Sequence, residues 1–450
     1  MRTRLFLALC FTLFFLLMYP SAELVVSLNP YQIRMTPPNW PFLPQLAPLY
    51  LSLNLLLPVA FFCLSEKRAG PFLAALIVQT LIAWPLFVLF PLSPIEPPSH
   101  PQSLSYQWAD MMNMDRNYFP SLHAAYAVTC LFFLRHPLVG VWSAGIAAST
   151  FLTYQHYPVD TLAGVLLACL AGWWAQGRGR AVGYCLYEMG RYTVRHGRYG
   201  LIAVALLLYS LVSPRRGWQA TVGFCYLQRL DDIQDGHLAW EGEPEDEARR
   251  QKELWSNLQF GNSILDTLAA TLHRTALPEQ AKLPLIIEEM RVDRQRVRHA
   301  EVWSGERLQE HLVRTFQLSL DLMLSAARAE LRSEDVPTLA PLLGWCSVVR
   351  DLEEDLALGL VNIPLEVVEQ KSFERWVQDE TKRASALYEQ AKIELAAVRG
   401  RSGYRLLHLF HGSVKKYLDR IDPVTLSKLA ESYVRDERKK LPNFGSPQEH

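Results

Sequence analysis

Two short acidic stretches in the second half of the sequence have the composition of a divalent metal site. They are YLQRLDDIQDGHL, with Asp231, Asp232 and Asp235, and VVRDLEEDLALG, with Asp351 and Asp355. Each contains two aspartates four residues apart, which places both carboxylates on one face of a helix. Mg²⁺ prefers hard oxygen ligands and binds one or two carboxylates together with substrate phosphates. A solvated helix face would explain one such pair, but two pairs predict a site for a Mg²⁺-bound diphosphate.

A second group of polar residues lies at the expected starts of apolar helices in the first half. They are Ser121 and His123 in NYFPSLHAAYA, and His156 and Asp160 in TYQHYPVDTLAG. A Pro-Ser at a helix start offers free backbone N–H groups and the positive end of the helix dipole to a phosphate. A carboxylate four residues after a histidine shares its helix face, fixes the imidazole tautomer and strengthens it as a nucleophile. Each histidine alone also fits a solvated interfacial residue, whereas the combination predicts phosphoryl transfer.

The elements that would carry the histidines are apolar. Only nine of the 45 Lys and Arg residues lie within residues 1–180. A membrane-crossing helix needs about 20 predominantly apolar residues. We predict six such helices, at about residues 5–19, 46–64, 71–91, 120–134, 138–154 and 160–176. The first segment, between MRTR and YPSA, also fits a signal peptide.

Loop charges predict the orientation of these six helices, because Lys and Arg accumulate on the cytoplasmic side. With a cytoplasmic start, seven basic residues lie inside and two lie outside. The inside group is Arg2, Arg4, Lys67, Arg68, Arg135, Arg178 and Arg180, and the outside group is Arg34 and Arg116. We therefore expect an integral protein of a bacterial inner membrane, with the histidines at the outer face and the rest of the chain in the cytoplasm.

The second half is predicted to be helical throughout, so the expected fold class of the whole chain is all-α. Apolar residues recur at spacings of three and four, and proline marks the breaks. The run LIAVALLLYSLV, residues 201–212, is too short for a clear membrane segment, and we expect a buried core helix rather than a seventh span. The expected organisation is a membrane domain at 1–180, a linker at 181–192, a helical domain at 193–440 and a polar tail at 441–450.

The sequence PSLH followed by HYPVD resembles the last two motifs of the type-2 phosphatidic acid phosphatase superfamily, PSGH and SRxxxxxHxxxD. The resemblance implies that His123 is the general acid, that His156 forms a phosphohistidine and that Asp160 orients it. Ser121 and Ser149 would bind phosphate. The first motif of that superfamily, KxxxxxxRP, is absent, and a threonine replaces the arginine of the SR pair. These departures are similar to the inositol phosphorylceramide synthase branch, which transfers a phospho-headgroup between lipids.

The two acidic motifs resemble those of squalene and phytoene synthases over about residues 190–440. FCYLQRLDDIQD is similar to YAFCRxxDDIxD, and VVRDLEEDLALGLVNIP is similar to LRDVxEDxxxGRxYLP. The resemblance implies that the five aspartates hold Mg²⁺-bound prenyl diphosphates in a bundle of helices. Arg229 and Arg350, beside the motifs, would contact the diphosphate, although pairing with surface carboxylates explains them equally well.

Together the two resemblances imply a bifunctional membrane enzyme of isoprenoid and lipid metabolism. A six-helix transmembrane phosphatase-like bundle would precede an all-helical isoprenoid synthase domain. Expected partners are prenyl diphosphates, a lipid phosphate and membrane lipids, and the formal net charge of zero gives no indication of nucleic acid binding. One alternative is an active prenyl synthase with an inactive membrane anchor or binding domain, and another is a class I terpene cyclase.

Overall fold

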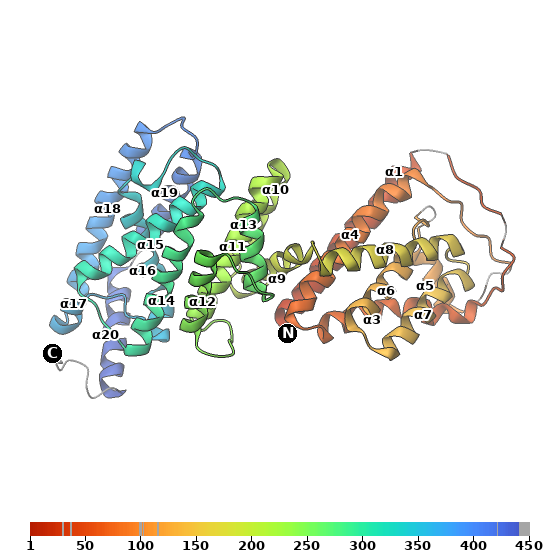
Figure 1. The fold of residues 1–450 in the computed structure, drawn as a ribbon, viewed down its shortest axis with the longest axis horizontal. Helices are drawn as coiled ribbons and strands as arrows, with labels where there is room; N and C mark the ends of the chain where they lie inside the picture. Colours follow the sequence, from red (N-terminus) through yellow and green to blue (C-terminus); the bar gives the residue numbers. More distant parts are fainter. Residues whose placement is uncertain are drawn as a thin grey trace. The chain divides into compact units, whose positions relative to one another are not determined.

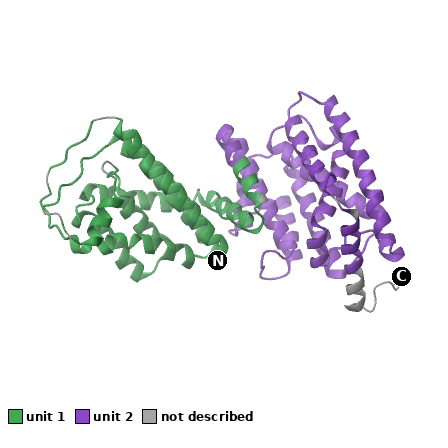
Figure 2. Cartoon of the chain, turned by 180° about the vertical axis from the view of Figure 1, so that it is seen from behind, with its two compact units in different colours: residues 1–205 green, residues 206–450 purple. Residues whose placement is uncertain are grey.

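The expected all-α class is confirmed by a computed structural model of the protein (Figure 1). It describes residues 1–28, 31–36, 38–98, 101, 103–114, 117–420 and 422–440. Within these ranges the structure contains helices and no strand, with a single isolated bridge between Ile33 and Leu92. Arg116 and the polar tail 441–450 lie outside the described residues. The chain forms two compact units, unit 1 (Met1–Ala205) and unit 2 (Leu206–His450) (Figure 2).

Unit 1 contains helices that are long and apolar enough to cross a membrane. Its helices are α1 (Arg2–Ser27), α2 (Ala47–Leu51), α3 (Leu53–Cys63), α4 (Glu66–Leu89), α5 (Leu104–Met112), α6 (Leu122–Leu134), α7 (Pro137–Leu152), α8 (Pro158–Gln176) and α9 (Arg180–Arg195). By length and composition, four segments qualify as spans: α1, α4, α8 and the segment Pro44–Cys63, which contains α2 and α3. The expected spans at α6 and α7 are shorter apolar helices.

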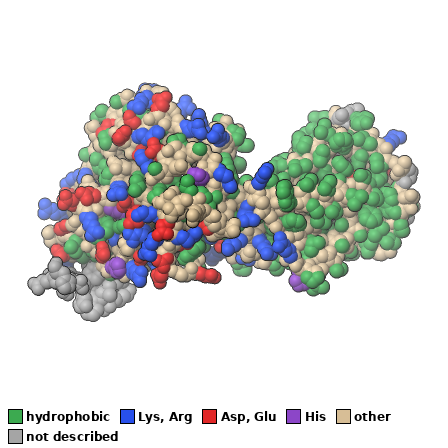
Figure 3. Space-filling model, viewed as in Figure 1, with side chains coloured by type: hydrophobic (Ala, Val, Ile, Leu, Met, Phe, Trp, Pro, Cys, Tyr) green, Lys and Arg blue, Asp and Glu red, His purple; other side chains and the backbone are tan. Residues whose placement is uncertain are grey.

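The surface of unit 1 is apolar where these helices face outward. Leu13 and Leu17 of α1 are 62% and 65% exposed, and Leu162 and Leu166 of α8 are 69% and 60% exposed. Hydrophobic side chains cover unit 1 in Figure 3, whereas charged side chains are spread over unit 2. An apolar surface this extensive is costly in water and favourable in lipid. Unit 1 therefore has the surface of a membrane protein.

Basic side chains gather at one end of the unit 1 helices. The Arg4 guanidinium donates to the Phe62 carbonyl at 2.8 Å, which joins the start of α1 to the end of α3. Arg68, at the start of α4, donates to a carbonyl of α6. Arg135, which follows α6, donates to the Gln176 side chain at the end of α8 at 2.9 Å. The predicted inside group therefore shares one end of the bundle, opposite the starts of α6 and α8.

The residues expected to form a linker, 181–192, lie within α9, which packs against α1 and α4 of unit 1. Two glycines allow the α4 and α9 backbones to touch. A Cβ atom built on Gly183 would lie 2.3 Å from the Pro71 nitrogen, and one on Gly70 would lie 2.1 Å from the Gly183 carbonyl oxygen. Small residues at such crossings are typical of packed membrane helices.

We predict that Gly183→Ala destabilises unit 1 by about 1–3 kcal/mol, because the added methyl group meets backbone atoms that cannot rotate away. Gly140→Ala on α7 is the matched control, since its nearest neighbour would be the Leu131 side chain at 3.5 Å. Thermal unfolding in detergent micelles should show a lower Tm for Gly183→Ala alone. Equal Tm values for the two variants would contradict the close crossing.

Unit 2 is a helical bundle with its own apolar core. Its main helices are α11 (Pro214–Gln234), α12 (Pro244–Asn257), α13 (Ile264–Arg274), α14 (Leu283–His299), α15 (Gly305–Ala326), α16 (Leu339–Leu358), α17 (Leu365–Gln370), α18 (Phe373–Ala397), α19 (Tyr404–Leu418) and α20 (Pro423–Lys440). The side chains of Leu324, Leu339, Leu342, Leu395 and Leu407 are fully or almost fully buried in one cluster from α15, α16, α18 and α19. This cluster holds α16, and with it the second acidic motif, in place.

The prediction of a buried core helix at 201–212 is wrong. These residues belong to α10 (Arg198–Val212), which connects the two units. Leu201, Leu207 and Leu211 are 76%, 60% and 71% exposed. Hydrophobicity and length identified the helix correctly, but neither reveals whether protein covers it.

A buried charged group joins α14 to α15. The His311 imidazole lies 2.8 Å from a Glu289 carboxylate oxygen and 3.0 Å from one of Asp293, so both ring nitrogens are positioned to donate. Burial disfavours the imidazolium, but the hydrogen bonds and charges of the two carboxylates outweigh it and raise the pKa of His311 to about 9. The protonated histidine thus offsets negative charge within the bundle.

This raised pKa predicts a pH-dependent stability. The stabilisation by His311 should be fully present below pH 6.5, the ordinary value, and should be lost as pH rises through about 9. We expect His311→Gln to lower the free energy of unfolding by about 2–3 kcal/mol at low pH and by less above pH 9. His299→Gln, at an exposed position on α14, is the control. Chemical denaturation across this range measures both, and a pH-independent difference would contradict the prediction.

Candidate functional site

Unit 1 brings the two predicted histidine motifs together at the starts of α6 and α8. The Ser121 N–H donates to the Asp160 carbonyl at 3.0 Å. A Cβ atom at Gly164 would lie only 2.2 Å from the Ser121 carbonyl oxygen, so the glycine permits the close approach of α6 and α8. The expectation that His156 and Asp160 share one helix face is wrong, because α8 begins at Pro158 and His156 lies in the turn before it. The crossing of α6 and α8, rather than helical spacing, brings the two motifs together.

The imidazole rings of His123 and His156 lie close together. Their ring centroids are 6.3 Å apart. The His123 ring is stacked on the Tyr50 ring at 4.0 Å, and the Tyr50 hydroxyl lies 3.1 Å from Nδ1 of His123. Nothing in the sequence around Tyr50 distinguishes it from an interfacial tyrosine. Its contact fixes the His123 ring, so it is a positioning residue that the sequence analysis missed.

His156 is 1% exposed, and its Nδ1 has one hydrogen-bond acceptor and a carboxylate nearby. Its Nδ1 lies 3.1 Å from the Tyr118 carbonyl oxygen and 3.8 Å from Oδ2 of Asp160. A proton on Nδ1 therefore points to acceptors, which leaves the lone pair on Nε2. Oδ2 of Asp160 also accepts from the Tyr157 N–H at 2.8 Å. The Tyr118 carbonyl, which the sequence analysis did not identify, therefore orients the His156 ring by a hydrogen bond.

The two serines expected to bind phosphate have different surroundings. Oγ of Ser121 caps α6 by accepting from the Ala124 N–H at 3.3 Å. Ser149 is fully buried within α7, and its hydroxyl donates to the Ile146 carbonyl at 2.7 Å. Ser121 therefore sits at a helix N-terminus, where backbone donors meet a phosphate, whereas the Ser149 proton is already engaged inside the helix.

In unit 2 the two acidic motifs face one another. Asp231 and Asp232 lie in the last turn of α11, and Asp235 follows as its C-terminal cap. The other motif, on α16, is reached across the bundle by His237, whose Nε2 lies 3.3 Å from a Glu354 carboxylate oxygen. The structure therefore brings together stretches that lie more than 100 residues apart in the sequence.

The carboxylates perturb one another electrostatically. Burial, followed by the charges of Asp231, Asp293 and Asp355, raises the pKa of Asp235 well above its ordinary value. Burial also raises the pKa of Asp355 to about 7, opposed by a hydrogen bond from Asn362 and assisted by the charges of Asp351 and Asp293. Like charges at close range lower the cost of binding a cation there. Asp293 of α14 also belongs to this carboxylate cluster, since its charge contributes to both shifts.

No three His, Cys, Asp or Glu side chains in the described part of the chain form a ready-made metal cage. Two polar side chains hold carboxylates of the acidic cluster in place by hydrogen bonds. The Asn362 amide donates to Asp355 at 2.9 Å, and the buried Arg296 guanidinium donates to the Asn362 carbonyl oxygen at 3.0 Å and to Asp293 at 2.9 Å.

The two arginines beside the motifs differ in exposure. Arg229 is 5% exposed, near the end of α11. The Arg350 side chain is 35% exposed, and its Nε donates to the neighbouring Asp351 at 2.8 Å. Arg350 therefore contacts an aspartate of the second acidic motif, and Arg229 is buried within the bundle.

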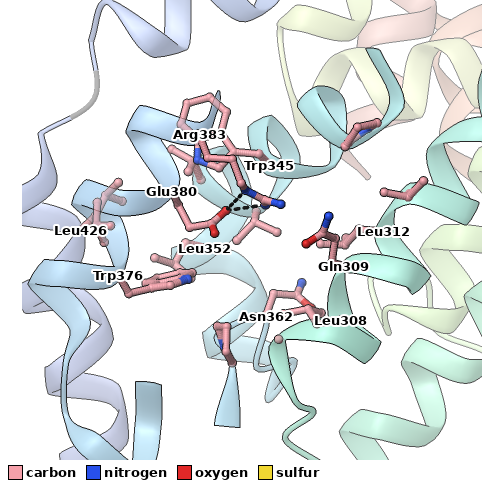
Figure 4. Close-up of a pocket in the computed structure, with 17 residues that line it drawn as sticks. Leu308, Gln309, Leu312, Trp345, Leu352, Asn362, Trp376, Glu380, Arg383 and Leu426 are labelled. Atoms are coloured by element: carbon pink, nitrogen blue, oxygen red, sulfur yellow. Dashed lines mark hydrogen bonds and ion pairs between the residues drawn. The ribbon is translucent and has the colours of Figure 1, made fainter. Parts of the chain in front are cut away.

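An apolar cavity of about 170 Å³ adjoins the carboxylate cluster (Figure 4). Its wall consists largely of side chains from α15, α16 and α18. Those labelled in the figure include Leu308, Leu312, Trp345, Leu352 and Trp376. Asn362 lines this cavity and also donates to Asp355, so the same side chain borders an apolar space and a charged one. The sequence analysis did not identify this residue.

Comparison with protein families finds one match in this chain. Residues 45–174 match the PAP2 superfamily, a range that contains Ser121, His123, His156 and Asp160. No curated protein and no solved structure matches the chain. The apolar helices and this match agree, since unit 1 contains helices long and apolar enough to cross a membrane and a region similar to the PAP2 superfamily.

Proposed function

We propose that unit 2 is a Mg²⁺-dependent enzyme that condenses or rearranges prenyl diphosphates. The observation that carries this proposal is the carboxylate cluster beside an apolar cavity, with Asn362 on the boundary. A prenyl diphosphate has the same two parts, a polyanionic head that needs cations and an apolar tail that needs to leave water. The likeness of the acidic motifs to squalene and phytoene synthases supports the same substrate class.

In this proposal Asp231, Asp232, Asp235, Asp351 and Asp355 hold the metal at the diphosphate. Bound Mg²⁺ supplies positive charge that makes the diphosphate a better leaving group. The carbon–oxygen bond breaks with its electron pair on the diphosphate, and an allylic cation remains. The apolar wall excludes water from this cation, so that a second prenyl chain or an internal double bond captures it. Capture by an internal double bond alone would make unit 2 a class I terpene cyclase.

We predict that Asp231→Ala or Asp351→Ala lowers diphosphate release from farnesyl or geranylgeranyl diphosphate by at least about 100-fold, since each removes a metal ligand. Glu353→Gln is the matched control, because Glu353 lies on α16 between the two motif aspartates but is exposed. Diphosphate release with and without Mg²⁺, and mass spectrometry of the extracted products, measure the effect. Turnover that survives both aspartate substitutions would rule out the assignment.

We propose further that unit 1 transfers phosphate from a lipid. Nε2 of His156 attacks phosphorus, the bond to the lipid oxygen breaks, and His123 gives that oxygen a proton. Water, or a lipid hydroxyl in a phosphotransferase, then takes the phosphate from His156. Backbone N–H groups at the start of α6 are the anion donors available beside Ser121. The resemblance to the inositol phosphorylceramide synthase branch, which transfers a phospho-headgroup between lipids, supports a lipid substrate, and an inactive anchor is the alternative.

We predict that His156→Gln abolishes release of phosphate from phosphatidic acid in mixed micelles. A glutamine retains hydrogen-bonding capacity in the buried site but cannot accept a phosphoryl group. His136→Asn is the control, because His136 caps the start of α7 through its side chain, a role that asparagine also performs. Acid-labile labelling of the wild type, absent from His156→Gln, would identify the phosphohistidine. Equal turnover of wild type and His156→Gln would favour the anchor alternative.

We also propose that the two sites work on opposite sides of the membrane. His123 begins α6, whereas Arg135 follows its last residue. With the basic end in the cytoplasm, the histidine site opens at the outer face, and the chain that continues from Arg180 starts inside. A product of unit 2 would then have to cross the bilayer to reach the histidines, or the two units act on different lipids.

A further inference from the structure

The helix α10 exposes most of its large apolar side chains. Its partly buried residues over 201–212 form one narrow stripe at helical spacing, made of Ala203, Leu206, Tyr209 and Ser210. The exposed side includes Leu201, Val204, Leu207, Leu208, Leu211 and Val212, which are between 54% and 86% exposed. A surface helix of a water-soluble domain places charged or polar residues on its exposed face. The exposed face of α10 over 201–212 carries apolar residues only.

The contact of α10 with α11 is of the kind found between membrane helices. A Cβ atom at Gly217 would lie 2.3 Å from the Cα of Ser210, so the two backbones touch there. The Ser210 hydroxyl donates to the Leu206 carbonyl at 2.8 Å and leaves no unsatisfied proton. Small residues at helix contacts, combined with large apolar residues facing outward, are typical of packing in lipid.

The length of α10 and the arginines on either side of it indicate the orientation of the helix in lipid. Its 15 residues span about 22 Å, less than the roughly 30 Å of a bilayer's hydrocarbon core. Arg195 precedes the helix, and the exposed Arg215 and Arg216 follow it. Arginines at both ends favour headgroups at both ends, which a short helix satisfies by lying along the surface.

We propose that α10 lies in the headgroup and upper acyl region of the membrane that holds unit 1, and anchors the start of unit 2 to that surface. This goes beyond the two proposed activities and does not depend on either. The partner is phospholipid, with acyl chains against Leu207, Leu208 and Leu211 and anionic headgroups against Arg215 and Arg216. The membrane segments of unit 1 in the same chain keep this lipid surface within reach of α10.

The test uses the full chain in lipid nanodiscs of phosphatidylcholine and phosphatidylglycerol. A single cysteine at Leu208 or Leu211, with the seven native cysteines replaced, carries an environment-sensitive fluorophore. We expect blue-shifted emission and loss of emission when the lipids carry a doxyl group near the headgroup. Ile393, a 65% exposed apolar residue on α18, is the matched control and should show neither effect.

Unquenched, water-like emission at both α10 positions would overturn the proposal. Crosslinking between two copies through Leu211→Cys, without quenching by lipid, would also overturn it in favour of a second chain as the partner. Should the cysteine replacements prevent folding, a photoreactive benzoylphenylalanine at Leu208 in the otherwise native chain gives a second measurement. Phospholipid adducts at that position support the proposal, and adducts to protein alone contradict it.

Discussion

Repulsion between buried carboxylates is the constraint on which the arrangement of unit 2 depends. Burial, together with the charges of Asp231, Asp293 and Asp355 from α11, α14 and α16, raises the pKa of Asp235. Such a cluster costs stability unless positive charge opposes it. Arg296 and His311 supply part of this charge from inside the bundle, both through Asp293. The negative charge of the carboxylate cluster that Arg296 and His311 do not offset lies between the two acidic motifs. In the proposed function, a cation bound with a phosphorylated substrate would neutralise it.

The site of unit 1 follows a different principle, since hydrogen bonds rather than opposite charges orient its groups. The Tyr50 hydroxyl and the Tyr118 carbonyl fix the two histidine rings, and no arginine stands in the position that the related phosphatases use. Phosphoryl transfer depends on stabilising developing negative charge. In the proposed phosphoryl transfer, a site with few cations would rely on backbone donors such as those at the start of α6.

The membrane gives the two units a common physical setting. Unit 1 has outward-facing leucines on helices of membrane-crossing length, and α10 has outward-facing leucines on a helix too short to cross. The prenyl product and the lipid phosphate of the two proposed activities would both partition into a bilayer, so the membrane rather than bulk water would set their concentrations. An apolar helix at the start of unit 2 would keep a cavity lined by Leu308 and Trp345 near that reservoir.

The sequence alone determined the all-α class, the apolar segments and which aspartates share a helix face, because these depend on local periodicity and length. It did not determine which residues from other segments each helix face contacts. Asn362 beside Asp355, Tyr50 on His123 and the glycine crossing at Gly183 arise from contacts between distant segments. The core helix expected at 201–212 failed for the same reason, since an apolar helix packs equally well against protein or lipid. Only the tertiary structure showed which helix faces are covered by other parts of the protein. The reason is that contacts between distant segments are not defined by a linear pattern.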